Sequence, residues 1–144
     1  MVIMLAAREI GAEVAKSARI ASAWVFGSCA RGDARVDSDL DLAVLLRPPE
    51  RADDAAALFD LAGRLERYSP GGRVDIVILG PQGAVLRHRI LAEGVLVHDI
   101  DPSARMAFEE RTTRDYLDWK PTHDIAMRST FAGLRDRFRE SPVR

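Results

Sequence analysis

The sequence contains a single cysteine, Cys29, and can therefore form no intramolecular disulfide and no cysteine-based metal cluster. Acidic and basic side chains nearly cancel, and the formal net charge of −1 lacks the basic footprint of a general nucleic-acid-binding protein. No apolar run approaches the length of a membrane span. The apolar start, Met1 to Leu5, is followed at once by Arg8 and Glu9, so no secretory signal develops. We therefore expect a soluble protein of the reducing cytoplasm, with no membrane partner and no direct nucleic-acid binding.

The remaining composition is that of a folded globular protein. Apolar residues make up 47% of the 144 residues, which is enough for one domain with a substantial core. No linker is long enough to separate two domains, and no internal repeat is visible. We expect a single α/β (α+β) domain over residues 1–144, with a core at about 20–100 and a C-terminal helical extension at about 102–140.

Apolar periodicity divides the chain into alternating helices and strands. Short β-branched runs bounded by Gly, Pro or Asp predict strands, whereas apolar residues three and four positions apart predict helices. Strands are expected at 23–26, 40–46, 73–79 and 95–97, and helices at 4–20, 53–67, 82–92, 104–119 and 123–139.

The C-terminal third holds much of the aromatic content, and Met106, Phe108, Tyr116 and Leu117 fall in one expected helix. Two interpretations of these helices stay open. They cover the sheet, or their apolar face docks a partner or a second copy of the chain. The choice between a homo-oligomer and a hetero-oligomer is open as well.

Two carboxylates mark the start of the second expected strand. Asp39 and Asp41 are two residues apart, and because side chains alternate along a strand both point to the same face. Two aspartates held this close repel each other unless a cation lies between them. A ligand set made only of oxygen suits Mg²⁺, which commonly brings phosphate oxygens with it. The plainer alternative is a pair of solvated residues at a strand end.

A loop of small residues, Gly27 to Gly32, precedes these carboxylates. Gly27 allows the backbone to approach a ligand closely, and Ser28 offers a hydroxyl and a backbone N–H at the start of a helical turn. Arg31 can add a forked cationic donor. Alone, Gly27-Ser28 could be a simple turn. The combination of loop and carboxylates, in this order and spacing, favours a phosphate site.

The full pattern is Gly27-Ser28, then ten residues, then Asp39-Leu40-Asp41. It resembles the signature of the DNA polymerase β-like nucleotidyltransferase superfamily. The string G-S-C-A-R-G, followed by S-D-L-D-L, is most similar to the minimal nucleotidyltransferase (MNT) branch, whose members are usually encoded beside a HEPN-type ribonuclease toxin. The resemblance covers about residues 20–100 well and the C-terminal part loosely. It implies a mixed β-sheet with the carboxylates on one face and helices packed on the sheet.

A third aspartate, Asp75, lies within the β-branched run 73–79. A carboxylate among Val and Ile side chains is costly unless something cationic holds it. From the residues alone, Arg73 could be that partner, because it is two positions away on the same face. The resemblance implies instead that Asp75 joins Asp39 and Asp41 in a metal site of three carboxylates.

The resemblance also implies roles for these residues. The three aspartates would be the catalytic residues and would bind Mg²⁺, with two ions expected. Gly27, Ser28 and Arg31 would bind the triphosphate of ATP, and Asp75 would receive the proton of the attacking hydroxyl. The implied reaction transfers AMP to a tyrosine of a cognate HEPN toxin and so neutralises it.

Two alternatives to this function remain. One is an antitoxin that binds its toxin without catalysis, through the C-terminal helices. The other is a transferase that acts on a small molecule such as an aminoglycoside. Enzymes of the second type usually carry an additional helical domain for the acceptor, and little chain is left here to build one.

Overall fold

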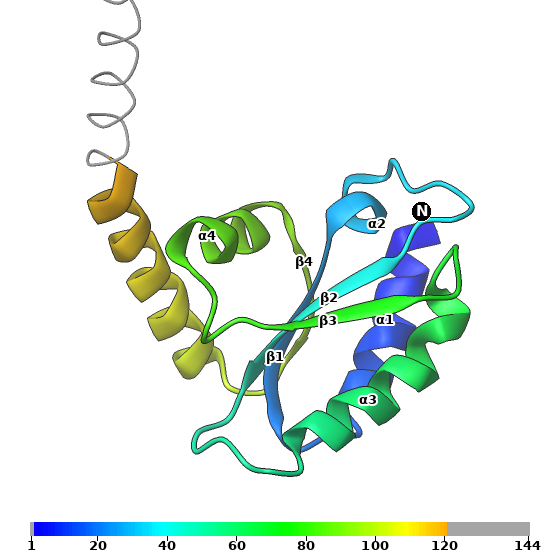
Figure 1. The fold of residues 1–144 in the computed structure, drawn as a ribbon, viewed down its shortest axis with the longest axis horizontal. Coiled ribbons are helices and arrows are strands. Elements are labelled where there is room, and N and C mark those ends of the chain that lie inside the picture. Colours follow the sequence, from blue (N-terminus) through cyan, green and yellow to red (C-terminus); the bar gives the residue numbers. More distant parts are fainter. Residues whose placement is uncertain (1, 121–144) are drawn as a thin grey trace, which may run out of the picture.

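The structure, a computed structural model, describes residues 2–120 and is built on one four-stranded sheet (Figure 1). The strands are β1 (Ile20–Phe26), β2 (Leu40–Leu46), β3 (Val74–Ile78) and β4 (Val95–Asp99), and their order across the sheet is β3-β2-β1-β4. β1 pairs antiparallel with β2 and β4, whereas β2 and β3 run parallel. The expected mixed sheet is confirmed.

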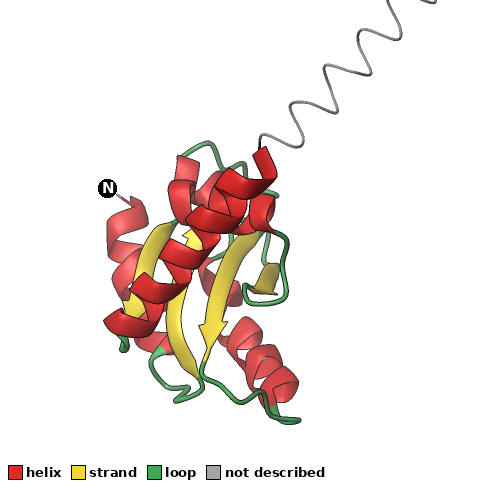
Figure 2. Ribbon diagram, turned by 90° about the vertical axis from the view of Figure 1, so that its left-hand side faces the viewer, coloured by secondary structure: helices red, strands yellow, loops and turns green. Residues whose placement is uncertain are grey.

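Helices connect the strands and pack on both sides of the sheet (Figure 2). A short helix, α2, follows β1 directly, as the expected helical turn at Ser28 requires. The expected helix at 123–139 lies outside the described residues. The helices are α1 (Val2–Val14), α2 (Gly27–Arg31), α3 (Asp54–Leu65), the 3-10 turn η1 (Glu66–Tyr68), α4 (Ala84–Glu93) and a last helix over 102–120.

The two faces of the sheet carry separate apolar clusters. Leu40, Leu42 and Val44 of β2 belong to the larger cluster, on the face that α1 and α3 cover. Ala43 belongs to the smaller cluster on the other face, together with side chains from α4 and from the 102–120 helix. Because side chains alternate along β2, Asp41 lies on the α4 face. The last helix therefore covers the sheet through Phe108, as one of the two interpretations expected.

The first helix is shorter than the spacing predicted. It ends at Val14 rather than near residue 20, and β1 begins at Ile20 rather than at Ala23. Ile20 lies six positions after Val14, which is off the helical spacing, and it is fully buried opposite Leu46 in the sheet. Its position therefore agrees with β1 and not with a continuation of α1. Within residues 2–120, none of the helices is both long and apolar enough to cross a membrane.

Candidate active site

The site begins at the sharp junction between β1 and α2. Gly27 has a φ of 71°, a left-handed conformation that favours glycine. Its α-carbon also faces Asp41 so closely that a β-carbon would overlap the carboxylate oxygen Oδ2. Gly32, with a φ of 81°, ends α2 and donates its N–H to the Ser28 carbonyl at 3.0 Å. Backbone freedom and close approach therefore both require glycine at position 27.

The first turn of α2 presents backbone donors beside this carboxylate. Phe26 occupies the N-cap position in an extended conformation and makes no side-chain capping bond. Because the first N–H groups of a helix lack partners within the helix, they stay available to an acceptor from outside. Ser28, in this turn, is half-buried. The junction thus offers the donors that the sequence predicted for phosphate.

Asp41 and Asp75 are brought together by the parallel pairing of β2 and β3. Their α-carbons are register partners, in line with the neighbouring pair Leu40 and Val74. Burial raises the pKa of Asp41, and the charges of Asp75 and Asp39 raise it further, while Arg31 acts in the opposite direction. The three predicted carboxylates therefore act on one another electrostatically. The strand pairing thus joins two aspartates, Asp41 and Asp75, that are more than thirty positions apart in the sequence.

Arg73 contacts a different aspartate from the one that the sequence suggested. Its Nε donates to Oδ1 of Asp39 at 2.9 Å, and this hydrogen bond is the main cause of a raised Arg73 pKa. The interpretation in which Arg73 pairs with Asp75 is therefore wrong for this structure. Parallel pairing places Arg73, just before β3, beside the residue just before β2, which is Asp39.

Arg31 lies at the edge of the site. Its Nε is 3.5 Å from Oδ2 of Asp33, and both side chains are well exposed. Such an exposed ion pair contributes little to stability, so Arg31 can turn toward another anion at small cost. The pull of Arg31 on the pKa of Asp41 shows that its charge reaches the carboxylates. A role in phosphate binding stays a prediction.

The donor chemistry of the site fits a divalent cation, although the side chains do not converge on one point. Carboxylate oxygens are the ligands that Mg²⁺ prefers. In the described part of the chain, however, no three His, Cys, Asp or Glu side chains are grouped closely enough to hold a metal. A cation held by these carboxylates would therefore take further ligands from water or from phosphate oxygens.

The turn before β3 supports the site in a way that the sequence did not indicate. Gly71 donates its N–H to the Ser38 carbonyl at 2.8 Å, and Leu40 donates to the Arg73 carbonyl at 2.9 Å. The Ser69 hydroxyl donates to that same Arg73 carbonyl at 2.6 Å. These bonds fasten the starts of β2 and β3 together. Composition identified 69–72 as a turn, but which segment it would contact depends on the parallel register.

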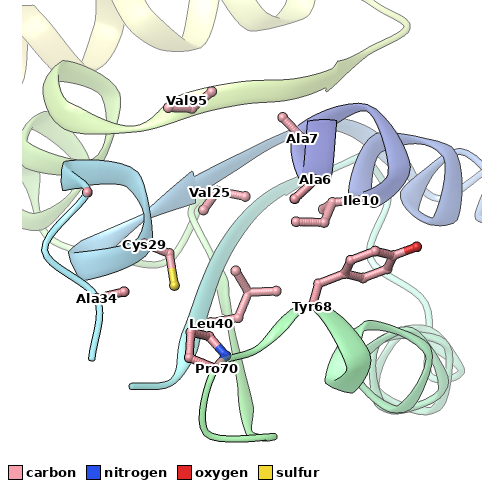
Figure 3. A pocket seen from close by; sticks show the side chains of 11 residues that line it. Ala6, Ala7, Ile10, Val25, Cys29, Ala34, Leu40, Tyr68, Pro70 and Val95 are labelled. Carbon is pink, nitrogen blue, oxygen red and sulfur yellow. The ribbon is translucent and has the colours of Figure 1, made fainter. Parts of the chain in front are cut away.

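A cavity of about 430 Å³ lies on the opposite face of the sheet (Figure 3). Leu40 lines it, and because side chains alternate along the strand, Asp39 and Asp41 point away from it. Cys29 lines it too, and burial, followed by the charge of Asp41, raises the pKa of the Cys29 thiol. This thiol is therefore a weak nucleophile that fills space. The other lining residues are mostly small or apolar: Ala6, Ala7, Ile10, Val25, Gly32, Ala34, Tyr68, Pro70 and Val95.

Comparison with known proteins gives a match of family and a match of fold. A family model described as "Polymerase beta, Nucleotidyltransferase" matches residues 8–103, which include all six predicted site residues. No curated protein sequence matches the chain significantly.

Several solved structures that resemble the chain are described as toxin–antitoxin structures. A chain of a toxin–antitoxin structure with AMP-PNP has a TM-score of 0.65 and 20% identity, over 84% of this chain and 98% of that one. A chain of an MntA–HepT structure has a TM-score of 0.63 and 19% identity, over 89% and 98%. A chain from a complex of tri-AMPylated Shewanella oneidensis HEPN toxin with MNT antitoxin has a TM-score of 0.63 and 18% identity, over 90% and 98%.

Proposed function

Because the chain belongs to the polymerase beta nucleotidyltransferase family, we propose that it transfers a nucleotidyl group from a nucleoside triphosphate to a hydroxyl. The observation that carries this proposal is the register that places Asp75 opposite Asp41, next to the Gly27 turn. Phosphate donors and clustered carboxylates on neighbouring elements are the two halves of such a site. The apolar cavity supplies neither half, because it lies on the other face.

Each part of the site has a role in this reaction. The Ser28 hydroxyl and the N–H groups of α2 bind the phosphates of ATP, and Arg31 adds positive charge. Asp39, Asp41 and Asp75 hold Mg²⁺, which when bound neutralises the triphosphate and stabilises the leaving pyrophosphate. The acceptor oxygen forms a bond to the α-phosphorus as the bond to pyrophosphate breaks. Asp75 accepts the proton of the attacking hydroxyl, and pyrophosphate leaves with the bonding electron pair.

The acceptor that we propose is a tyrosine hydroxyl on a cognate HEPN toxin, so that addition of AMP neutralises the toxin. Support comes from the relatives of the same fold, one of which was solved with a tri-AMPylated HEPN toxin and another with AMP-PNP. A protein acceptor also fits the shape of the chain, because the helix over 102–120 packs on the sheet through Phe108. This helix therefore covers the core of the domain and does not form a separate domain for binding a small-molecule acceptor.

An antitoxin that acts by binding alone is the second candidate. Met106 and Leu117 support it, because their side chains are 60% and 58% exposed and lie eleven positions apart on one face of the last helix. Exposed apolar side chains can take part in docking, although the exposed polar residues Glu110 and Thr113 lie between these two on the same face. Docking is also compatible with catalysis, so the two candidates are separated by whether the toxin is chemically changed.

The decisive experiment is the intact mass of the toxin candidate encoded beside this protein. The candidate is co-expressed with the wild type or with the D39N/D41N double variant, which keeps the size and polarity of the side chains. We expect a wild-type-only gain of about 329 Da, one AMP residue on the chemistry proposed here, or a multiple of it. A stable complex of unchanged mass would instead establish a binding antitoxin. Absence of both complex and mass gain would point to a small-molecule acceptor.

A further inference from the structure

We propose that Arg73 is a built-in counter-cation of the carboxylate cluster, which a divalent cation must displace from Asp39 before it can bind. This inference rests on the proposed function, since it assigns Asp39 to the metal. The contact that supports the inference does not depend on that assignment: the Arg73 Nε donates to the Asp39 Oδ1 at 2.9 Å. The carboxylates of Asp75 and Asp37 also attract this guanidinium. Arg73 thus faces the same negative charge as the cation would.

The backbone of Arg73 is fixed at this place. Its carbonyl accepts hydrogen bonds from the Leu40 N–H at 2.9 Å and from the Ser69 hydroxyl at 2.6 Å. Leu40 follows Asp39 directly, so the stem of the arginine and the carboxylate are anchored to each other through the backbone. The backbone of Arg73 therefore stays near Asp39 even when the exposed guanidinium turns away, so the hydrogen bond can form again after displacement.

The ion pair itself is weak enough to be displaced. The Arg73 side chain is 74% exposed and that of Asp39 is 32% exposed, so water screens their attraction. Arg19 and Asp54 form a contrasting pair, with side chains only 15% and 7% exposed. Arg19 also donates to the carbonyls of Arg47 and Pro49, both at 2.7 Å. The Arg19–Asp54 pair is thus largely shielded from water, whereas the exposed pair can exchange one cation for another.

Competition follows from charge and from geometry. The Arg73 guanidinium occupies a lone pair of Asp39 Oδ1, so that lone pair cannot coordinate a metal ion. Its positive charge also repels a metal ion nearby. At separations of about 4 Å in water, one unit charge changes the affinity for another by about fivefold. The pair therefore lowers the affinity for the free metal without closing the site.

The test is the affinity for Mn²⁺ alone, measured by electron paramagnetic resonance without nucleotide or toxin. We expect Arg73→Gln to bind Mn²⁺ about three- to tenfold more tightly than the wild type. Arg73→Lys keeps the charge and should stay near the wild type. Arg114→Gln removes a remote exposed arginine, paired with Glu110, and controls for net charge. Unchanged or weaker binding by Arg73→Gln, or no Mn²⁺ binding by either protein, would overturn the proposal.

A second measurement needs no variant and covers the case in which Arg73→Gln fails to fold. The side-chain Nε–H resonances of the arginines are followed by nuclear magnetic resonance while Mg²⁺ is added to the wild type. We expect the Arg73 resonance to shift as its bond to Asp39 is lost, and that of buried Arg19 to stay in place. An unchanged Arg73 resonance at saturating Mg²⁺ contradicts displacement. Neither measurement involves nucleotidyl transfer, so failure of this inference and failure of the proposed reaction are distinguishable.

Discussion

Asp41 on β2 and Asp75 on β3 are direct partners in the parallel register of the sheet, and their charges oppose each other. This relationship joins the D-x-D pair to a residue from a distant part of the chain. The ionised form of Asp41 is disfavoured as a result, because this side chain is half-buried and close to like charges. A half-buried carboxylate beside like charges is a candidate ligand for a cation.

Asp41→Asn should therefore raise the stability of the metal-free protein at pH 7. The folded pKa of Asp41 lies above its ordinary value of 3.8, so the folded state holds its proton more tightly than the unfolded state does. The wild type accordingly loses stability as the pH rises from below 3.8 through the raised pKa, whereas the variant lacks this loss. Urea unfolding from pH 3 to pH 7 measures the difference.

The same variant should lower nucleotidyl transfer by at least about a hundredfold, because it removes charge from the metal site. A gain in stability together with a loss of activity separates this effect from misfolding. If Asp41→Asn were less stable at pH 7 than the wild type, the like-charge relationship with Asp75 would be wrong.

Gly27→Ala should abolish transfer and cost about 1–2 kcal/mol of stability, the usual penalty of a left-handed residue with a side chain. Gly32→Ala is the matched control, because Gly32 also has a positive φ but has no heavy atom within 4 Å of an added β-carbon. Both variants should unfold more easily, yet only Gly27→Ala disturbs Asp41. Thermal unfolding and a transfer assay compare them. Equal losses of activity in both would show that backbone strain, and not contact with Asp41, matters.

Gly71→Ala should shift the start of β2 and reduce transfer by about tenfold or more, since misplacement by about 1 Å is costly to positioned groups. An added β-carbon would lie 2.5 Å from the Asp37 carbonyl oxygen and 3.0 Å from that of Ser38. Gly63→Ala, in α3, meets no heavy atom within 4 Å and should instead stabilise the protein by about 0.5–1 kcal/mol. Full activity in Gly71→Ala would show that the turn tolerates movement.

Asp54→Asn should destabilise the protein at pH 7 and have little effect at low pH. The Asp54 carboxylate accepts from the Arg19 Nε at 2.7 Å and from the Arg51 N–H at 2.8 Å, and these bonds lower its pKa. Its contribution is present above the ordinary value of 3.8 and is lost as the pH falls through the lowered pKa. Urea unfolding of both proteins at pH 7 and below pH 3 tests this. A difference that persists at the lower pH would assign the effect to packing instead.

Local chemistry determined much of this protein. The order Gly27-Ser28 and Asp39-x-Asp41 needs only chain connectivity and the alternation of side chains along a strand, both of which are set by covalent geometry. The four strands and the helices of the described part were predicted for the same reason, although several ends differ, such as that of β4, which runs to Asp99 and not to 97. The largest difference is at Ile20, where burial against Leu46 places the residue in β1 and not in the first helix.

Only the tertiary structure decided the relations between distant segments. The parallel register places Asp75 opposite Asp41. It also brings Arg73 within hydrogen-bond distance of Asp39, although Arg73 is nearer in sequence to Asp75. Register is fixed by the packing of a whole face and by the turn at 69–72, and neither is encoded in the spacing of any one motif. The apolar cavity behind Leu40 likewise arises only where α1, α2 and η1 meet. Sequence thus defined the reactive groups, and long-range pairing determined which of them contact one another.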